Sequence, residues 1–226
     1  MKCQNLAPFP FGKWGATGAL VNHESAVVCG GYNGNTNLKE CHIITKRNII
    51  HLPPMETMRS MAASIPINNT LWVLGGFNHN GNSLEKSTEF VEIPMSNASM
   101  PPSTNDWNCE EDEEQCMMMP LALFSHTILE IEANVYMLIG GRNSSIKATQ
   151  NTYLKKGNQK WTRGPDLQEA RYDHASGILT DKITLKKSVV VVGGRNMTHN
   201  LKTVEFLTLP IPVKGTDAEW QWQPGN

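Results

Sequence analysis

The sequence has little net charge and no long apolar stretch. Its 226 residues carry 20 basic and 21 acidic side chains, which leaves a formal net charge of −1 at pH 7. A near-neutral chain lacks the electrostatic attraction that draws basic proteins to nucleic acid or anionic lipid. No apolar run approaches the roughly 18 residues that a membrane-spanning helix needs. We therefore expect no nucleic-acid partner and no membrane insertion.

A secretory signal and the composition of a disordered chain are also missing. Pro8 and Pro10 interrupt the apolar stretch that follows Met1, so the apolar core of a signal peptide, about 7–15 residues long, is absent. Apolar residues make up 39% of the chain and the net charge is close to zero. A disordered chain typically has few apolar residues and a high net charge. If the chain is complete as given, the absence of a signal predicts a cytoplasmic protein.

Four Gly-Gly pairs, each at the end of an apolar run, divide the chain. Their first glycines are Gly30, Gly75, Gly140 and Gly193, which lie 45, 65 and 53 residues apart. A period of about 50 residues is that of a β-propeller blade. The spacing therefore predicts a repeat protein and not one ordinary domain.

The residues around each Gly-Gly pair repeat as well. A short strand pattern begins upstream at Ala16, Ala62, His126 and His174, and another begins downstream at Glu40, Glu89, Thr152 and Glu205. A fourth strand is expected around Trp107, Trp161 and Trp220. Short β-branched or aromatic runs bounded by Gly, Asn and Pro are typical of strands. No segment shows the pattern of a helix.

This pattern resembles the kelch repeat. The kelch motif has a start similar to Arg-x-x-His, an apolar strand that ends in Gly-Gly, an aromatic residue in the third strand and a Trp in the fourth. The last repeat matches best, with His174, Gly193-Gly194, Phe206 and Trp220. The resemblance implies an all-β fold, a partial β-propeller of four-stranded kelch blades. Propellers of this type usually have about five to seven blades around an axis.

The repeats predict where each blade begins and ends. Residues 1–12 correspond to the outer strand of a preceding blade, 13–58 to the first blade, 59–119 to the second with an acidic insertion, 120–170 to the third and 171–226 to the fourth. Four blades and one extra strand predict either part of a larger propeller or four blades that assemble as they stand. Open blade edges would favour self-association.

The five cysteines include two candidate disulfide pairs and one cysteine without a candidate partner. Cys29 and Cys41 are expected on adjacent antiparallel strands, within bridging distance. Cys109 and Cys116 flank the acidic insertion and form the second pair, which leaves Cys3. The pattern Cys-Gly-Gly…Glu-Cys also resembles that of some secreted animal kelch proteins, which favours an extracellular location. The alternative is that all five are reduced and that Cys29 and Cys41 pack as small apolar side chains.

Four Asn-x-Ser/Thr sequons are candidate glycosylation sites. They are Asn68, Asn97, Asn143 and Asn196. The chain is rich in Asn, Ser and Thr, so this number is close to what chance gives. The sequons therefore support secretion less than the cysteine pairing does.

The sequence contains no recognisable catalytic or metal-binding constellation. The acidic run Glu110–Glu114 lacks the alternating ligands and the glycine of a calcium loop. His126 and His174 occupy a repeat position that Ala16 and Ala62 fill elsewhere, which favours packing over catalysis. Some kelch-like propellers are copper-dependent oxidases, but no set of Tyr, Cys and His ligands matches theirs. We expect no enzyme activity, no cofactor and no metal, with a copper-dependent oxidase as the distant alternative.

Binding of another protein is the leading prediction, because loops carry function in propellers while strands position them. The residues directly after Gly-Gly are Tyr32, Phe77, Arg142 and Arg195, and Arg59 and Arg171 lie in the other loops. Aromatic residues and arginines are good interface anchors. The structural alternative is that Arg59 and Arg171 pair with a neighbouring blade and that the others are ordinary turn residues. The alternative function is a cytosolic kelch adaptor or cytoskeletal scaffold.

Overall fold

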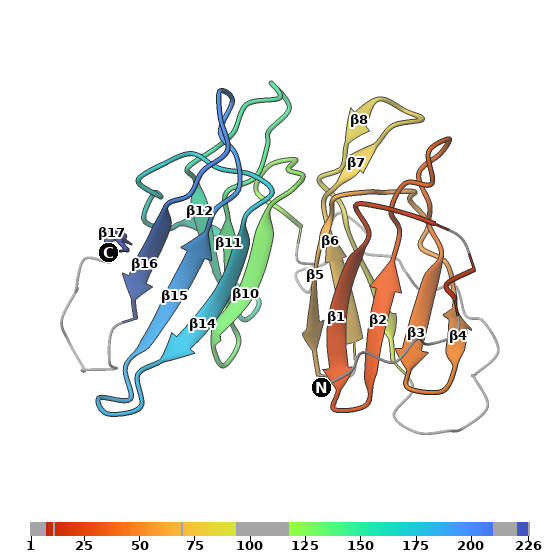
Figure 1. The fold of residues 1–226 in the computed structure, drawn as a ribbon, viewed down its shortest axis with the longest axis horizontal. Helices are drawn as coiled ribbons and strands as arrows, with labels where there is room; N and C mark the ends of the chain where they lie inside the picture. Colours follow the sequence, from red (N-terminus) through yellow and green to blue (C-terminus); the bar gives the residue numbers. More distant parts are fainter. Residues whose placement is uncertain (1–7, 11, 69, 94–117, 210–220, 226) are drawn as a thin grey trace. The chain divides into compact units, whose positions relative to one another are not determined.

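The computed structural model describes residues 8–10, 12–68, 70–93, 118–209 and 221–225. Its named elements are all β-strands, so the described part of the chain is all-β, as the sequence predicts. None of the described segments forms a helix that could cross a membrane. The chain divides into two compact units, residues 1–124 and 125–226, which are considered separately (Figure 1).

The first unit begins with a four-stranded antiparallel blade. Its strands are β1 (Thr17–Asn22), β2 (Ser25–Cys29), β3 (Cys41–Thr45) and β4 (Ile49–Leu52), hydrogen-bonded in the order β1-β2-β3-β4. Each strand pairs with the next one along the chain, which is the simple up-and-down connection of a propeller blade. These four strands thus form one complete blade.

The second blade of this unit contains β5 (Ala63–Ile67), β6 (Thr70–Leu74) and β9 (Thr88–Glu92), in the order β5-β6-β9. A small hairpin of β7 (Phe77–Asn78) and β8 (Ser83–Leu84) interrupts the connection from β6 to β9. The sequence pattern did not predict this hairpin, because two-residue strands carry no periodicity.

The second unit begins with another four-stranded blade. Its strands are β10 (Thr127–Glu132), β11 (Val135–Ile139), β12 (Thr152–Lys156) and β13 (Thr162–Arg163), in the order β10-β11-β12-β13. This order is the same as in the first blade, so the repeat seen in the sequence is a repeat of whole sheets.

The last blade contains β14 (Ala175–Thr180), β15 (Lys187–Val192), β16 (Val204–Thr208) and β17 (Gln223–Pro224). These strands follow one another in the sheet in chain order. Pro224 lies opposite Glu205 on the edge strand, a place where the missing N–H of proline is tolerated.

Among the predicted fourth-strand tryptophans, Trp161 is the one that the structure describes. Trp161 directly precedes β13, while Trp107 and Trp220 lie outside the described residues. The buried indole of the last blade belongs to Trp222, which donates its Nε1–H to the carbonyl of Pro165 at 3.1 Å. Trp222 thus ties the last blade to the exit of the third.

Each unit has a hydrophobic core that is shared by its two blades. In the first unit, Val27 and Ile43 pack in one cluster with Leu71 and Val91. In the second, Met137 packs in one cluster with the side chains of the last blade, including Val189, Val191, Leu207 and Trp222. Each buried side chain of this size stabilises the fold by about 1.5–3 kcal/mol. A blade therefore depends on its neighbour for most of its core, as in other repeat proteins.

Candidate interaction surface at the Gly-Gly loops

The four Gly-Gly pairs form the turns that end the second strand of each blade. All eight glycines have φ between 58° and 104°, a region that other residues rarely adopt. A Cβ on Gly140 would lie 2.7 Å from the carbonyl oxygen of Arg171, at the start of the next blade. The second glycine also donates its N–H to the next blade: Gly31 to the carbonyl of Arg59 at 2.9 Å and Gly141 to that of Arg171 at 2.8 Å. Gly-Gly is thus required by the close approach of two blades.

The residue after Gly-Gly pairs with the first residues of its own blade. Tyr32 exchanges two backbone hydrogen bonds with Trp14, and Arg195 exchanges two with Tyr172, all between 2.8 and 3.0 Å. These bonds involve only main-chain atoms, so they hold the residue in place whatever its side chain is. We call the end of each unit that carries these residues its loop face.

An aromatic cluster lies on the loop face of the first unit. It consists of Trp14, Tyr32, Phe77 and His79. The ring of Tyr32 lies 5.4 Å from that of Trp14 and 4.7 Å from that of His79, and Phe77 lies 4.5 Å from His79. Trp14 remains 53% exposed. Tyr32 and Phe77, predicted separately from the sequence, are therefore brought into one patch.

A buried asparagine fixes the two halves of the aromatic cluster. The side chain of Asn37, in the first blade, donates to the carbonyl of Phe77 at 2.6 Å and accepts from the N–H of His79 at 3.0 Å. Asn37 is almost fully buried, so these hydrogen bonds are shielded from water and hold the small hairpin against the first blade.

An arginine cluster lies on the loop face of the second unit. It consists of Arg142, Tyr172 and Arg195. The guanidinium carbon of Arg142 lies 4.8 Å from the centre of the Tyr172 ring, and that of Arg195 lies 5.8 Å from it. Arg142 also donates to the carbonyl of Ile146. Because Tyr172 is buried and Arg195 is exposed, the ring serves as a platform for two cations.

An asparagine follows Gly-Gly-x in each of the four blades, and this repeated position was not predicted to have a structural role. Asn33, Asn78, Asn143 and Asn196 each accept, with Oδ1, backbone N–H groups two to four residues further on. This is the Asx turn, in which the side chain replaces a backbone acceptor. The signal was available, since Asn follows Gly-Gly-x in all four blades.

Arg59 is buried, which corrects its prediction as a surface residue. Its guanidinium donates to the carbonyls of Gly75 and Ser87 and forms an ion pair with Glu89. Glu89 also accepts the N–H of Glu56 and that of Thr57. Because every partner lies within the chain and the side chain is 0% exposed, Arg59 fastens the connection between the first two blades and is not available to a partner.

Arg171 repeats this arrangement in the second unit and is corrected in the same way. It donates to the carbonyls of Gly193 and Thr203 and pairs with Glu205. Glu205 also accepts the N–H of Gln168 at 2.7 Å. Both arginines therefore have the structural role that was the alternative interpretation of the sequence, and the interaction surface excludes them.

The other two blades carry different residue pairs at the same position. The third strands can be aligned at the residue opposite the last residue of the second strand, which is Cys41, Thr88, Thr152 or Val204. The glutamates of the ion pairs, Glu89 and Glu205, are the next residues after Thr88 and Val204. They therefore correspond to His42 in the first blade and to Tyr153 in the third. The residue that corresponds to Arg59 is Lys13 in the first blade and the buried Leu123 in the third. Burial and the nearby Lys13 and His51 lower the pKa of His42 to about 4. The imidazole is therefore neutral at pH 7.

His126 and His174 are buried within the second unit. The Nε2 atom of His174 lies 3.0 Å from the Thr127 hydroxyl, whereas neither ring nitrogen of His126 has a partner among the described residues. Burial lowers the pKa of each to about 3, helped by His174 at His126 and by Arg171 at His174. Both rings are neutral at pH 7, which fits the packing role that the repeat position predicts.

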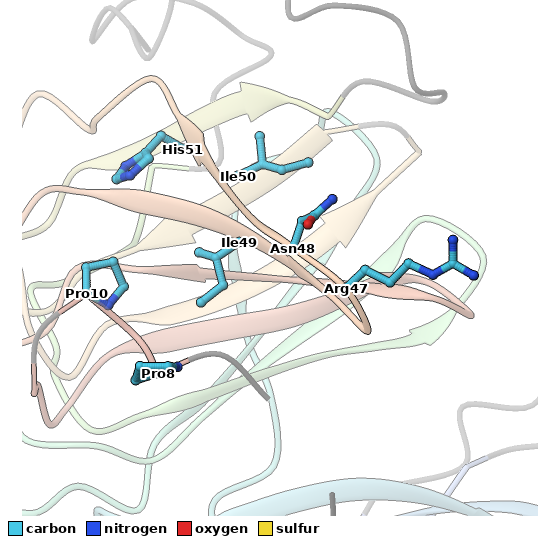
Figure 2. Close-up of a pocket in the computed structure, with 7 residues that line it drawn as sticks. All are labelled: Pro8, Pro10, Arg47, Asn48, Ile49, Ile50 and His51. Atoms are coloured by element: carbon cyan, nitrogen blue, oxygen red, sulfur yellow. The ribbon is translucent and has the colours of Figure 1, made fainter. Parts of the chain in front are cut away.

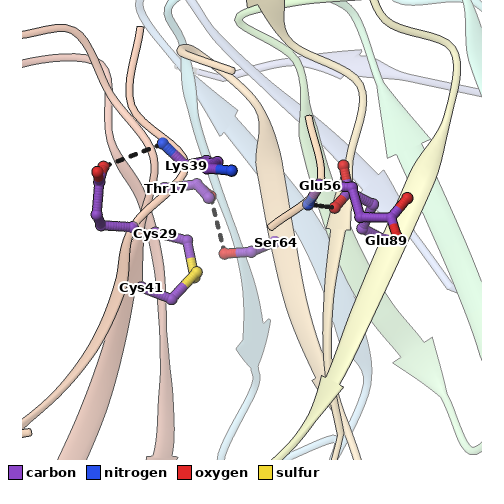
Figure 3. Close-up of a disulfide and its surroundings, with 8 residues drawn as sticks. Thr17, Cys29, Lys39, Cys41, Glu56, Ser64 and Glu89 are labelled. Atoms are coloured by element: carbon purple, nitrogen blue, oxygen red, sulfur yellow. Dashed lines mark hydrogen bonds between the residues drawn. A yellow bond between two sulfur atoms is a disulfide. The ribbon is translucent and has the colours of Figure 1, made fainter. Parts of the chain in front are cut away.

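The disulfide between Cys29 and Cys41 is present and joins β2 to β3 (Figure 3). The two residues lie directly opposite each other in the sheet, and both are fully buried. This confirms the first predicted pair. Cys3, Cys109 and Cys116 lie outside the described residues.

The described sequons lie in turns. Asn68 is exposed beside the turn between β5 and β6, while Asn143 and Asn196 are two of the Asx-turn asparagines. The amide nitrogen of Asn196 donates to Glu169 at 3.1 Å. Asn97 lies outside the described residues, as does the acidic run Glu110–Glu114. The role of asparagine in the Asx turn therefore explains why Asn occupies two of the four sequon positions, Asn143 and Asn196.

An open groove runs along the outer edge of the first blade (Figure 2). Pro8 and Pro10 line one side of it and residues 47–51 line the other. Figure 2 shows Ile49 between the two prolines and the strand, with Arg47 pointing away. The groove contains no cluster of chemically reactive side chains. Over the described ranges, no three His, Cys, Asp or Glu side chains gather in a way that could hold a metal ion.

Blades with this strand order, Gly-Gly turns and shared cores define a β-propeller of kelch type. Compared with models of known protein families, the chain matches none. It is 30% identical over 139 residues to the Kelch repeat and BTB domain-containing protein 2 of cowpox virus strain GRI-90 / Grishak, which covers 58% of this chain and 22% of the relative. The protein of the same name from strain Brighton Red is 26% identical over 168 residues, or 70% of this chain and 27% of the relative.

The blades and these similarities together support a kelch-repeat propeller. Its fold is that of a protein-interaction module. The chain spans about a quarter of the length of the curated relatives it matches.

Proposed function

We propose that the chain binds another protein through its loop faces. The observation that carries this proposal is the common backbone position of Tyr32, Phe77, Arg142 and Arg195. Paired main-chain bonds to the start of the blade hold Tyr32, Phe77 and Arg195, and Arg142 forms a backbone bridge with Ala148. The position carries two aromatic residues and two arginines. These residue types dominate the energetics of protein interfaces. The fixed backbone also reduces the entropy lost on binding.

The test is a comparison of captured partners between matched variants. Tyr32→Ala with Arg195→Ala removes one anchor from each unit without touching a core residue. Arg47→Ala, in the exposed turn before β4, is the control for loss of a surface arginine. We expect a specific partner to be lost from the first variant and kept by the second. A partner that is retained by both would place binding elsewhere.

We further propose that the module acts without catalysis and forms part of a larger protein. The matched share of the cowpox virus relatives supports the second point, since it is only 22–27% of their length. Two locations remain in competition. The disulfide between Cys29 and Cys41 supports an extracellular protein. The alternative is a cytosolic adaptor, and the names of the relatives pair kelch repeats with a BTB domain.

The redox state of Cys29 and Cys41 separates these locations. Cells are lysed in acid to trap thiols, and the protein is alkylated before and after reduction and analysed by mass spectrometry. An extracellular protein retains the disulfide in the cell, so both cysteines react only after reduction. Complete alkylation before reduction would support the cytosolic adaptor. Stoichiometric copper in the purified protein would favour the oxidase alternative over both.

A further inference from the structure

One turn of the last blade differs from the corresponding turns of the other three. The first and second strands are joined through the closing pairs Asn22–Ser25, Ile67–Thr70 and Glu132–Val135, each with two residues between. In the last blade the closing pair is Thr180–Lys187, with six residues between. Since three blades fold with the short turn, the longer one is not required by the fold. We call residues 179–187 the apolar turn.

The apolar turn presents aliphatic side chains to solvent. Ile183 is 93% exposed, Leu185 is 74% exposed and Leu179 is 53% exposed. The short turns contain residues such as His23 and Glu24 in the same place. A cluster of exposed aliphatic side chains on one turn is unusual in a monomeric protein and marks a surface that contacts something.

Lysines lie next to these aliphatic residues in the sequence of the turn. Lys182, Lys186 and Lys187 are all exposed, and Asp181 is the one acidic residue of the apolar turn. The turn therefore carries a local charge of about +2, which the net charge of −1 for the whole chain does not reveal. A turn that exposes both lysines and aliphatic side chains is complementary to a surface that is apolar within and anionic outside.

Hydrogen bonds order the apolar turn. Asp181 Oδ1 accepts the N–H groups of Ile183 and Thr184 and the hydroxyl of Thr184, at 2.6–2.9 Å. The N–H of Leu185 donates to the carbonyl of Asp181, and the N–H of Asp181 donates to the carbonyl of Lys186. The tip is thus held out from the blade before it meets a partner. In Figure 1 it extends beyond the ends of β14 and β15.

We propose that the apolar turn docks on the surface of a lipid bilayer that contains anionic lipid. The area of the tip favours this occupant, because a stable protein interface uses about 20–30 residues a side and the turn offers nine (179–187). A lipid surface needs only a few apolar side chains in the interfacial region and lysines near the headgroups. No spanning helix is needed for such contact. The turn lies at the opposite end of β15 from Arg195, so the arginine cluster stays free for a protein partner.

The experiment is co-sedimentation of the 226-residue chain with phosphatidylcholine vesicles, with and without about 30% phosphatidylserine. We expect binding to the anionic vesicles, weaker binding to pure phosphatidylcholine, and loss of binding in high salt because screening weakens the lysine contacts. Ile183→Ser with Leu185→Ser should lower the partition coefficient at least tenfold. Lys182→Gln, Lys186→Gln and Lys187→Gln should each lower it about fivefold.

The control is Lys147→Gln with Lys202→Gln, which removes two exposed lysines from loops at the opposite end of the strands. This variant should bind anionic vesicles as the parent does. Circular dichroism and thermal unfolding check that each variant folds. Failure of the parent to sediment with anionic vesicles, or equal binding by the tip variants, would overturn the proposal. Self-association or binding of a protein that depends on Ile183, without vesicle binding, would assign the turn to a protein interface.

Discussion

At the scale of single residues, the buried ion pairs explain why two arginines are absent from the surface. Arg59 and Arg171 resemble good interface anchors in the sequence, because a guanidinium in a loop is usually exposed. Their glutamate partners follow 30 and 34 residues later on the third strand. A glutamate opposite the next-to-last residue of the second strand, as Glu89 is to Val73 and Glu205 is to Val191, was the signal that would have predicted burial.

The first prediction concerns this ion pair. Glu205→Ala should lower the free energy of unfolding of the second unit by about 3 kcal/mol, because the buried Arg171 guanidinium loses its close counter-charge and keeps only the half-buried Glu169 at 4.0 Å. Urea unfolding followed by intrinsic fluorescence measures the change.

A double variant provides the control for that prediction. Arg171→Leu with Glu205→Tyr copies Leu123 and Tyr153, which occupy the same positions in the third blade. It should recover much of the lost stability, since apolar replacement of a buried ion pair is often neutral. A single variant as stable as the parent would show that the pair contributes little.

At the scale of strands and turns, the repeat could be predicted well because its determinants are local. Apolar runs that end in Gly-Gly predict the second strands, and the positive φ of both glycines explains why no other residue replaces them. The fourth strands were less predictable. Trp222 is a buried indole of the last blade, whereas the spacing pointed to Trp220, which lies outside the described residues.

The second prediction concerns the disulfide between β2 and β3. Reduction should lower the free energy of unfolding of the first unit by about 2–4 kcal/mol, because the bond closes a loop of 12 residues and restricts the unfolded chain. Urea unfolding with and without reductant measures it, with Cys29→Ala plus Cys41→Ala as the reductant-insensitive control. An unchanged midpoint on reduction would contradict the prediction.

The third prediction concerns the Asx turns. Asn78→Ala should destabilise the first unit by about 1 kcal/mol, because the N–H groups of Asn80 and Gly81 lose their acceptor. Asn78→Asp keeps an acceptor oxygen and should retain most of the stability. Thermal unfolding distinguishes the two, and equal losses in both variants would show that the turn bonds are not responsible.

At the scale of the whole molecule, the composition argued against a disordered chain but concealed local features. A net charge of −1 and an apolar content of 39% are ordinary values. Because these two values are averages over the whole chain, they do not reveal the arginine cluster, the aromatic cluster or the apolar turn. The grouping of Trp14 with His79 was also hidden, because 65 residues separate them and only the packing of two blades brings the rings to 6.3 Å.

The fourth prediction is loss of stability in acid. His42, His126 and His174 have pKa values of about 4, 3 and 3 in the folded chain, against about 6.5 when unfolded. Between these values the unfolded chain binds more protons, so the free energy of unfolding falls as the pH drops from about 6.5 towards 3–4. Urea titrations at several pH values measure the slope.

A substitution tests the source of that pH dependence. His126→Ala copies Ala16 and Ala62, which fill the same position in the first unit. The variant should fold and should show a shallower loss of stability in acid than the parent. An identical slope would mean that carboxylates, not the buried imidazoles, control the acid response.

The main-chain bonds around each Gly-Gly pair have a consequence for how such a protein changes over time. Tyr32, Phe77 and Arg195 are each held by N–H and C=O groups that every residue except proline possesses. Mutation can therefore exchange an aromatic residue for an arginine at this position with little penalty in stability. A lineage can acquire a new partner in single steps, each of which leaves the blade intact.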